Sequence, residues 1–181
     1  LGRDSSVGRV VPETEVRFVI DGKDVPRGEV GELLVRGAQV MLGYWKQPEI
    51  TRQVLDEDGW LHTGDLARID EDGYIYIVDR LKEMIISMGE NIYPREVEEI
   101  VYRFDNIKEA AVIGIEDKIR GQACACYFSS KDGAKIDTRA LKKFLQKNLA
   151  LYKVPREYHQ LEELPHTSTG KIFKRALIEQ K

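Results

Sequence analysis

The sequence has few cysteines, no long apolar run and no strong excess of either charge. Its two cysteines, Cys124 and Cys126, have a spacing that fits neither a CxxC redox motif nor a zinc-binding pair. Apolar runs such as Ala110–Ile115 fall far short of the ~20 residues that a membrane-spanning helix needs. These absences argue against a spanning helix and favour two reduced thiols in a cytoplasmic protein. Because the chain begins at Leu1 without Met or an apolar leader, we expect a fragment or a processed product.

Charge is nearly balanced, with 28 Lys and Arg against 31 Asp and Glu and a formal net charge of −3. This balance argues against a nucleic-acid-binding surface over the whole chain, and the basic tail at 171–175 is too short a patch to supply one. With 42% hydrophobic and 33% charged residues, the composition is that of a folded protein. A length of 181 residues predicts one large domain or two small ones.

The residue patterns predict a β-rich first part, an α+β second part, and a boundary between residues 81 and 82. β-branched and aromatic residues separated by glycine turns predict strands at 16–20, 29–36 and 74–78. Pro48 predicts a short helix at 49–55. Apolar residues at helical spacing predict helices near 94–104 and 138–149, the second capped by Asp137 or Thr138, with strands at 110–115 and 122–128 between them. A short final helix is expected after Lys171.

The acidic turn sequence Asp-Glu-Asp-Gly occurs twice, at 56–59 and at 70–73. Calcium binding is the first interpretation to consider, but an EF-hand loop needs glycine at position 6 and glutamate at position 12. Both segments lack that spacing. We therefore predict two turns in which an Asp side chain bonds to nearby backbone.

Three short motifs contain residues that could bind a ligand, but each of them could also have a purely structural role. Asp65, after Thr63 and Gly64, can accept two hydroxyl hydrogen bonds as ribose-binding carboxylates do, or it can cap a turn. Asp79 and Arg80 suggest an ion pair, which can be purely structural. Residues 88–91 predict a tight turn that leads into the helix starting at Pro94.

A fourth motif, His-Thr-Ser-Thr-Gly-Lys at 166–171, ends in a lysine on a small-residue loop. A Walker A loop is excluded, because Pro165 and Ile172 stand at required positions. Lys171 can still reach a phosphate or carboxylate as a point charge, although by spacing alone a solvated surface lysine is favoured. The three histidines have no metal-ligand spacing, so no metal site is predicted.

Taken in order, these motifs resemble the adenylate-forming superfamily of acyl-CoA synthetases, aryl-CoA ligases, luciferases and peptide-synthetase adenylation domains. The matching stretches are collinear over the whole chain and lie at 31–33, 41–45, 59–66 (GWLHTGDL), 72–74, 79–85 (DRLKEMI), 89–98 and 164–172. The resemblance implies that residues 1–81 form the last, β-barrel-like subdomain of the AMP-binding domain. Residues 82–181 would then form a small, mobile α+β lid domain.

The resemblance implies a reaction with two halves. A carboxylate and Mg-ATP give an acyl-adenylate and pyrophosphate, and the thiol of coenzyme A then displaces AMP. Asp65, assisted by Arg80, corresponds to the carboxylate that holds the ribose hydroxyls. Lys171 corresponds to the catalytic lysine, which lowers the repulsion between the two anions that react. Lys82 corresponds to the hinge about which the lid rotates between the two halves.

For coenzyme A, the resemblance implies that Gly89 lets the pantetheine arm approach and that Tyr152 stacks on the adenine. Lys153 would favour the CoA phosphates, although Val154 stands where some relatives carry an arginine. The phosphate loop, the Mg²⁺ site and the acyl pocket are expected upstream of Leu1. The isolated fragment is therefore expected to be inactive.

Among the subfamilies, the stretches at 79–86 and 89–94 favour a long-chain fatty-acid–CoA ligase. The alternatives are an aryl-CoA ligase of the 4-coumarate type, a luciferase-like enzyme, and, from another class, a non-catalytic interaction module. The expected partners are a small-molecule carboxylate, ATP and CoA, without nucleic acid. A fatty substrate would favour loose contact with membranes, and the sequence implies no particular oligomer.

Overall fold

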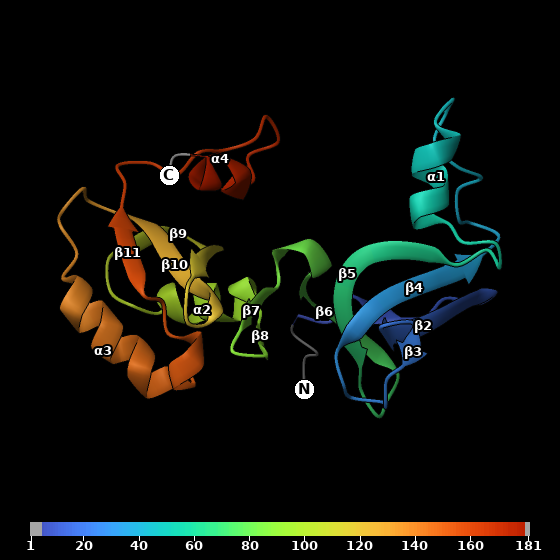
Figure 1. Cartoon of the computed structure of the whole chain (residues 1–181), viewed down its shortest axis with the longest axis horizontal. Coiled ribbons are helices and arrows are strands. Elements are labelled where there is room, and N and C mark those ends of the chain that lie inside the picture. Colours follow the sequence, from blue (N-terminus) through green and yellow to red (C-terminus); the bar gives the residue numbers. More distant parts are fainter. Residues whose placement is uncertain (1–4, 180–181) are drawn as a thin grey trace. The chain divides into compact units, whose positions relative to one another are not determined.

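The computed structural model describes residues 5–179 and divides the chain into two compact units, Leu1–Lys82 and Glu83–Lys181 (Figure 1). The predicted α+β class is confirmed, with strands in both units and the longer helices in the second. The division falls one residue after the boundary that the sequence predicts. The roles of the units, as the end of an AMP-binding domain and as a mobile lid, stay predictions.

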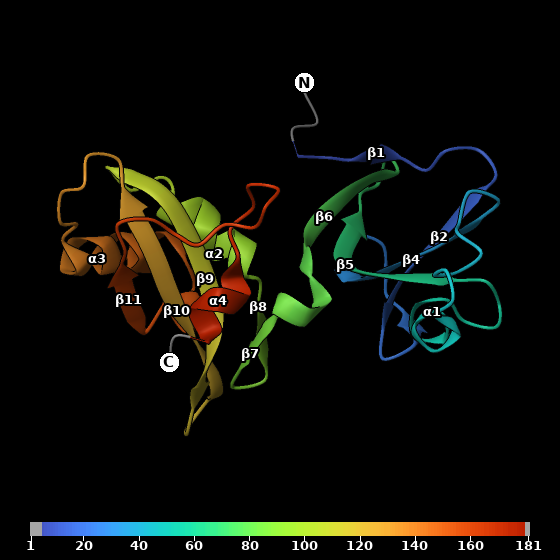
Figure 2. The same ribbon diagram turned by 90° about the horizontal axis from the view of Figure 1, so that it is seen from above.

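The first unit is a curled antiparallel sheet with the strand order β1-β6-β5-β4-β2-β3 (Figures 1 and 2). Its elements are β1 (Gly8–Arg9), β2 (Thr14–Ile20), β3 (Lys23–Asp24), β4 (Gly31–Gly37), α1 (Pro48–Val54), β5 (Leu61–Ile69) and β6 (Tyr74–Arg80). Phe18 and Leu33 belong to one buried apolar cluster, and their neighbours Val19 and Leu34 to another, because successive side chains point to opposite faces. In the described residues β1 and β3 are the sheet's end strands, so the sheet is barrel-like but open.

Both acidic turns have the geometry that the sequence predicts. Asp56 Oδ1 accepts the backbone N–H of Trp60 at 2.8 Å, and Asp70 Oδ1 accepts that of Tyr74 at 2.9 Å. Gly59 and Gly73 have φ of +81° and +83°, a region in which glycine carries no steric penalty. The second turn joins β5 to β6, whereas the first lies between α1 and β5.

The second unit is built on a five-stranded sheet. Its strands are β7 (Ile85–Ser87), β8 (Glu90–Ile92), β9 (Ile107–Asp117), β10 (Gly121–Ser130) and β11 (Glu157–Gln160). Its helices are α2 (Pro94–Val101), α3 (Thr138–Asn148) and α4 (Lys174–Ile178), with short 3-10 turns η1 (Leu81–Glu83) at the unit boundary and η2 (Leu151–Lys153). β10 pairs with β9 and β7 antiparallel and with β11 parallel.

Helices cover both faces of the β9–β10 ribbon, which explains why its sequence is apolar almost without interruption. On one face α2 and α3 contribute buried residues to a cluster with Val112, Cys124, Cys126 and Phe128. On the other face Leu177 of α4 and Leu164 pack with Ala111, Ile113, Ala125 and Tyr127. The segment that carries Lys171 therefore belongs to the face opposite α3.

Several elements differ from the sequence-based prediction. The helix expected to reach residue 104 ends at Val101, although Phe104 still packs edge-on against Phe144 with ring centroids 5.5 Å apart. β5 was not predicted, because its first half is polar. Asp137, not Thr138, is the cap of α3, where its side chain accepts two backbone N–H groups. Among residues 5–179 no helix has the length and apolarity to cross a bilayer.

Candidate functional site

Neighbouring strands β5 and β6 bring Asp65 and Arg80 together. The two residues are paired in register, and Arg80 Nε lies 2.7 Å from Asp65 Oδ1. The Asp65 side chain is 28% exposed, so part of the carboxylate is open to a ligand. A carboxylate with one oxygen fixed by a guanidinium and the other accessible can accept hydroxyl donors. The geometry of Asp65 beside Arg80 fits a diol ligand such as ribose.

The backbone at Asp65 is fixed by its neighbours. Gly64 has φ of +69°, and the Thr63 hydroxyl donates to the Leu33 carbonyl at 2.7 Å while accepting the Asp65 N–H at 3.1 Å. Glu32 on β4 accepts the Gly64 N–H at 3.3 Å. These contacts fix the backbone conformation from which the Asp65 side chain projects.

Two residues around Asp65 differ from the sequence-based expectation. The guanidinium of Arg80 pairs with Asp65, whereas Asp79 Oδ1 accepts the Arg80 backbone N–H at 2.7 Å. The Arg80 guanidinium thus forms an ion pair across two strands. Glu32, which the sequence analysis did not single out, also lies 3.1 Å from His62 Nδ1. Its place in the matched stretch at 31–33 was the only signal that pointed to it.

Lys171 lies near the tip of a small hairpin. The Thr167 N–H donates to the Lys171 carbonyl at 2.8 Å, and the Phe173 N–H donates to the Pro165 carbonyl at 2.7 Å. Gly170, with φ of +79°, supplies the left-handed residue of the turn. The side chain of Lys171 is exposed and has no partner among the described residues. Its amine is therefore presented on an ordered loop and is available to an anion.

The remaining cations of the basic tail pair with carboxylates, Lys174 in a largely buried site and Arg175 on the surface. Lys174 lies within 3 Å of the carboxylates of Glu83 and Glu98, and Arg175 pairs with Glu179 at 3.1 Å. Lys171 alone of these three cations lacks a carboxylate partner within residues 5–179. This pairing weakens the case for a nucleic-acid-binding tail.

The residues proposed for coenzyme A lie in two turns of the second unit. Met88 and Gly89 have φ of +54° and +83°, the pattern of a two-residue hairpin turn between β7 and β8. A side chain at position 89 would meet no atom within 4 Å, so the space above this glycine is open. Tyr152 in η2 is 39% exposed, and Lys153 Nζ lies over its ring at 5.7 Å from the centroid.

Lys153 has a closer partner than a ligand phosphate. Its Nζ lies 2.7 Å from both carboxylate oxygens of Glu96, and its side chain is only 17% exposed. Burial disfavours its charge, but the Glu96 carboxylate outweighs burial and raises the pKa of Lys153. A contact with CoA phosphates would require this pair to open. Lys82, the predicted hinge, is exposed and is the last residue of the first unit.

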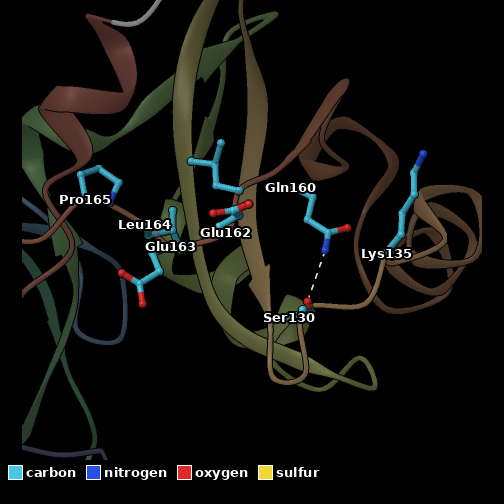
Figure 3. Close-up of a pocket in the computed structure, with 9 residues that line it drawn as sticks. Ser130, Lys135, Gln160, Glu162, Glu163, Leu164 and Pro165 are labelled. Atoms are coloured by element: carbon cyan, nitrogen blue, oxygen red, sulfur yellow. Dashed lines mark hydrogen bonds between the residues drawn. The ribbon is translucent and has the colours of Figure 1, made fainter.

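A cavity of about 1080 Å³ in the second unit reaches Pro165 at the base of the Lys171 hairpin (Figure 3). It is lined by Ser130, Lys135, Gln160, the segment 161–165 and Gly133. The Gln160 amide donates to the Ser130 hydroxyl at 3.3 Å and to the Ala134 carbonyl at 2.8 Å. The amide group of Gln160 therefore stabilises the wall of the cavity. Within residues 5–179 no three His, Cys, Asp or Glu side chains gather as metal ligands would.

Comparison with known proteins agrees with the motif order. Residues 96–171 match the AMP-binding enzyme C-terminal domain, and residues 2–45 match the AMP-binding enzyme family. A long-chain-fatty-acid–CoA ligase of Bacillus subtilis is 45% identical over 98% of this chain and 32% of its own length. A feruloyl-CoA synthase of an Amycolatopsis species is 48% identical over 89% of this chain and 33% of its own length.

A solved structure shows the same likeness in three dimensions. ATP-bound MatB from Rhodopseudomonas palustris superposes with a TM-score of 0.90 at 34% identity, covering 97% of this chain and 35% of that one. The chain belongs to the AMP-binding, adenylate-forming enzymes. It spans about a third of the length of the curated relatives that it matches.

Proposed function

We propose that this chain is the C-terminal part of an AMP-forming acid–thiol ligase, which converts a carboxylate, ATP and CoA into acyl-CoA, AMP and pyrophosphate. The observation that carries the proposal is Lys171, an exposed amine on a hairpin with no partner among residues 5–179. The Asp65–Arg80 pair and the similarity to CoA ligases over nearly the whole chain support it.

In the first half-reaction, a carboxylate oxygen attacks the α-phosphorus of ATP, and pyrophosphate leaves. Asp65 would accept the ribose hydroxyls, and Arg80 would hold that carboxylate in place. Lys171 would lie between the carboxylate and the α-phosphate, where a cation offsets the repulsion of two anions and stabilises charge in the transition state. ATP brings Mg²⁺, and we assign the metal ligands to residues outside this sequence.

In the second half-reaction, the thiol of CoA attacks the acyl-adenylate carbonyl, and AMP leaves. We propose that rotation about Lys82 withdraws Lys171 and brings the Gly89 turn to the nucleotide. The open space above Gly89 suits the narrow pantetheine arm, and the exposed Tyr152 ring suits stacking on the CoA adenine.

For the substrate, we propose a long-chain fatty acid, following the name of the Bacillus subtilis relative. The feruloyl-CoA synthase favours an aryl carboxylate as the second candidate. A panel of fatty acids and hydroxycinnamates, tested with the complete enzyme, distinguishes them by their kcat/KM values. We also propose a cytoplasmic enzyme with loose membrane contact, which vesicle flotation of the complete enzyme would test.

The role of Lys171 is tested by separating the two half-reactions in the complete enzyme. Removing a donor of this kind costs about 3–4 kcal/mol, so Lys171→Ala should slow acyl-adenylate formation by a factor of about 10²–10³. Thioester formation from supplied acyl-adenylate should be largely spared. Lys142→Ala, a change of another exposed lysine in the same unit, is the matched control. Equal loss in both half-reactions would contradict the assignment.

We further propose that the 181 residues alone do not form an acyl-adenylate, because the phosphate loop and the Mg²⁺ site are expected outside them. Pyrophosphate exchange catalysed by the isolated chain would overturn this. A non-catalytic interaction module would predict that Lys171→Ala leaves the activity of the complete enzyme unchanged. The same pair of assays therefore separates a ligase from a scaffold.

A further inference from the structure

Lys174, three residues after Lys171, joins three elements of the second unit. Its Nζ lies 2.9 Å from Glu83 Oε2 in η1 and 2.8 Å from Glu98 Oε1 on α2. The Lys174 side chain is 21% exposed and that of Glu98 is 14% exposed. Glu98 Oε1 also accepts the Val112 N–H of β9 at 2.7 Å. One largely buried ammonium thus joins α4 to α2 and to the residue that follows Lys82.

This network fixes one end of the Lys171 hairpin. Phe173 closes the hairpin through its bond to the Pro165 carbonyl, and Lys174 is the next residue. Burial opposes a charge on Lys174, but Glu98 and Glu83 outweigh burial and raise its pKa, so the ammonium stays charged at neutral pH. Breaking a buried ion pair of this kind is strongly unfavourable, because losing one partner leaves an uncompensated charge.

We propose that Lys174 is a positioning residue for Lys171, which it holds at a fixed place relative to Glu83 and α2. This inference rests on the proposed function of Lys171. Because Glu83 directly follows the proposed hinge residue, the network also makes the hairpin move as one body with the segment that leaves the hinge. Lys174 itself touches no reacting atom in this scheme.

A misplacement of about 1 Å can reduce a rate by about 100-fold when a reaction depends on an aligned charge. In the complete enzyme, Lys174→Met should therefore lower kcat for acyl-adenylate formation by about 10- to 100-fold. The KM for ATP should change little, since Asp65 and Arg80 bind the nucleotide in this scheme. Thioester formation from supplied acyl-adenylate should stay within about twofold, and Lys174→Arg should restore much of the lost rate, because it keeps the charge.

Lys171→Ala in the same assays separates this inference from the proposed function. If Lys171→Ala abolishes adenylation and Lys174→Met does not reduce it, only the positioning role is wrong. If Lys171→Ala leaves adenylation intact, the proposed function is wrong as well. Equal loss of both half-reactions in Lys174→Met, without rescue by arginine, would show a purely structural role and overturn the inference.

Hydrogen exchange gives a second readout that does not depend on activity. In the 181-residue chain, Lys174→Met should speed exchange at the hairpin amides of Thr167 and Gly170, whereas amides of α3 keep their protection. If Lys174→Met does not fold, Glu83→Gln replaces it, since this change leaves the buried Lys174–Glu98 pair intact. Unchanged hairpin exchange in a folded variant of either kind would overturn the proposal.

Discussion

Replacing Gly89 with alanine separates backbone strain from a role in catalysis. Gly89 has φ of +83° and open space above it, so an added methyl group meets no protein atom but must adopt a left-handed backbone. That conformation costs about 1–2 kcal/mol. At about 2–4 °C per kcal/mol for a chain of this size, the melting temperature should fall by about 2–8 °C.

Gly133 is the matched control, because it has φ of +76° and also has nothing within 4 Å. Gly133→Ala should therefore lower the melting temperature by a similar amount. In the complete enzyme, only Gly89→Ala should slow thioester formation from acyl-adenylate and CoA, on the order of tenfold, because the methyl group enters the space assigned to pantetheine. Acyl-adenylate formation should be unchanged in both variants.

The reasoning fails if the two alanine variants slow the thioester step equally, because strain alone would then explain the loss. It also fails if Gly89→Ala retains full activity with CoA while it shows the expected loss of stability. In that case the turn between β7 and β8 does not meet the pantetheine arm.

Three further changes test the core, the thiols and the nucleotide contact. Leu145→Ala, at a fully buried position, should cost about 2–5 kcal/mol in urea unfolding, whereas Asp137→Ala should cost only about 1 kcal/mol; a reversed order would contradict the assigned core. Burial raises the pKa of Cys124 to about 12, so Ellman's reagent at pH 8 should label the cysteines only after unfolding, and rapid labelling of the native chain would contradict their burial. Asp65→Asn in the complete enzyme should weaken ATP binding about tenfold by calorimetry, since hydrogen bonds to a charged group contribute about 1.5–3 kcal/mol; unchanged affinity would remove Asp65 from the ribose site.

The pattern of apolar residues in the sequence predicted two of the helices and the central strand pair of the second unit. Helices α2 and α3 follow from apolar residues three and four apart, and the ribbon of β9 and β10 follows from an apolar run that is buried on both faces. β5 escaped prediction, because Thr63, Gly64 and Asp65 are turn-type residues. Their strand conformation depends on pairing with β4 and β6, which local propensity does not encode.

The candidate site was only partly predictable for the same reason. Asp65, Arg80 and Lys171 were identified through their resemblance to a family, because each is weak as an isolated motif. The partners of other charges depend on tertiary packing: Lys174 meets Glu83 across 91 positions, and Lys153 meets Glu96 across 57. No spacing rule reaches so far, so the sequence alone did not indicate either ion pair.

The helix α2 also has a consequence for how the protein avoids self-association. Among the described strands β9 pairs only with β10, and such an unpaired strand border can recruit a strand from another molecule. Here the Glu98 carboxylate occupies the Val112 N–H, and the Tyr102 hydroxyl occupies the Ala110 N–H at 3.1 Å. With the N–H groups of Ala110 and Val112 already satisfied, this part of the border offers fewer donors to an incoming strand, which disfavours intermolecular pairing there.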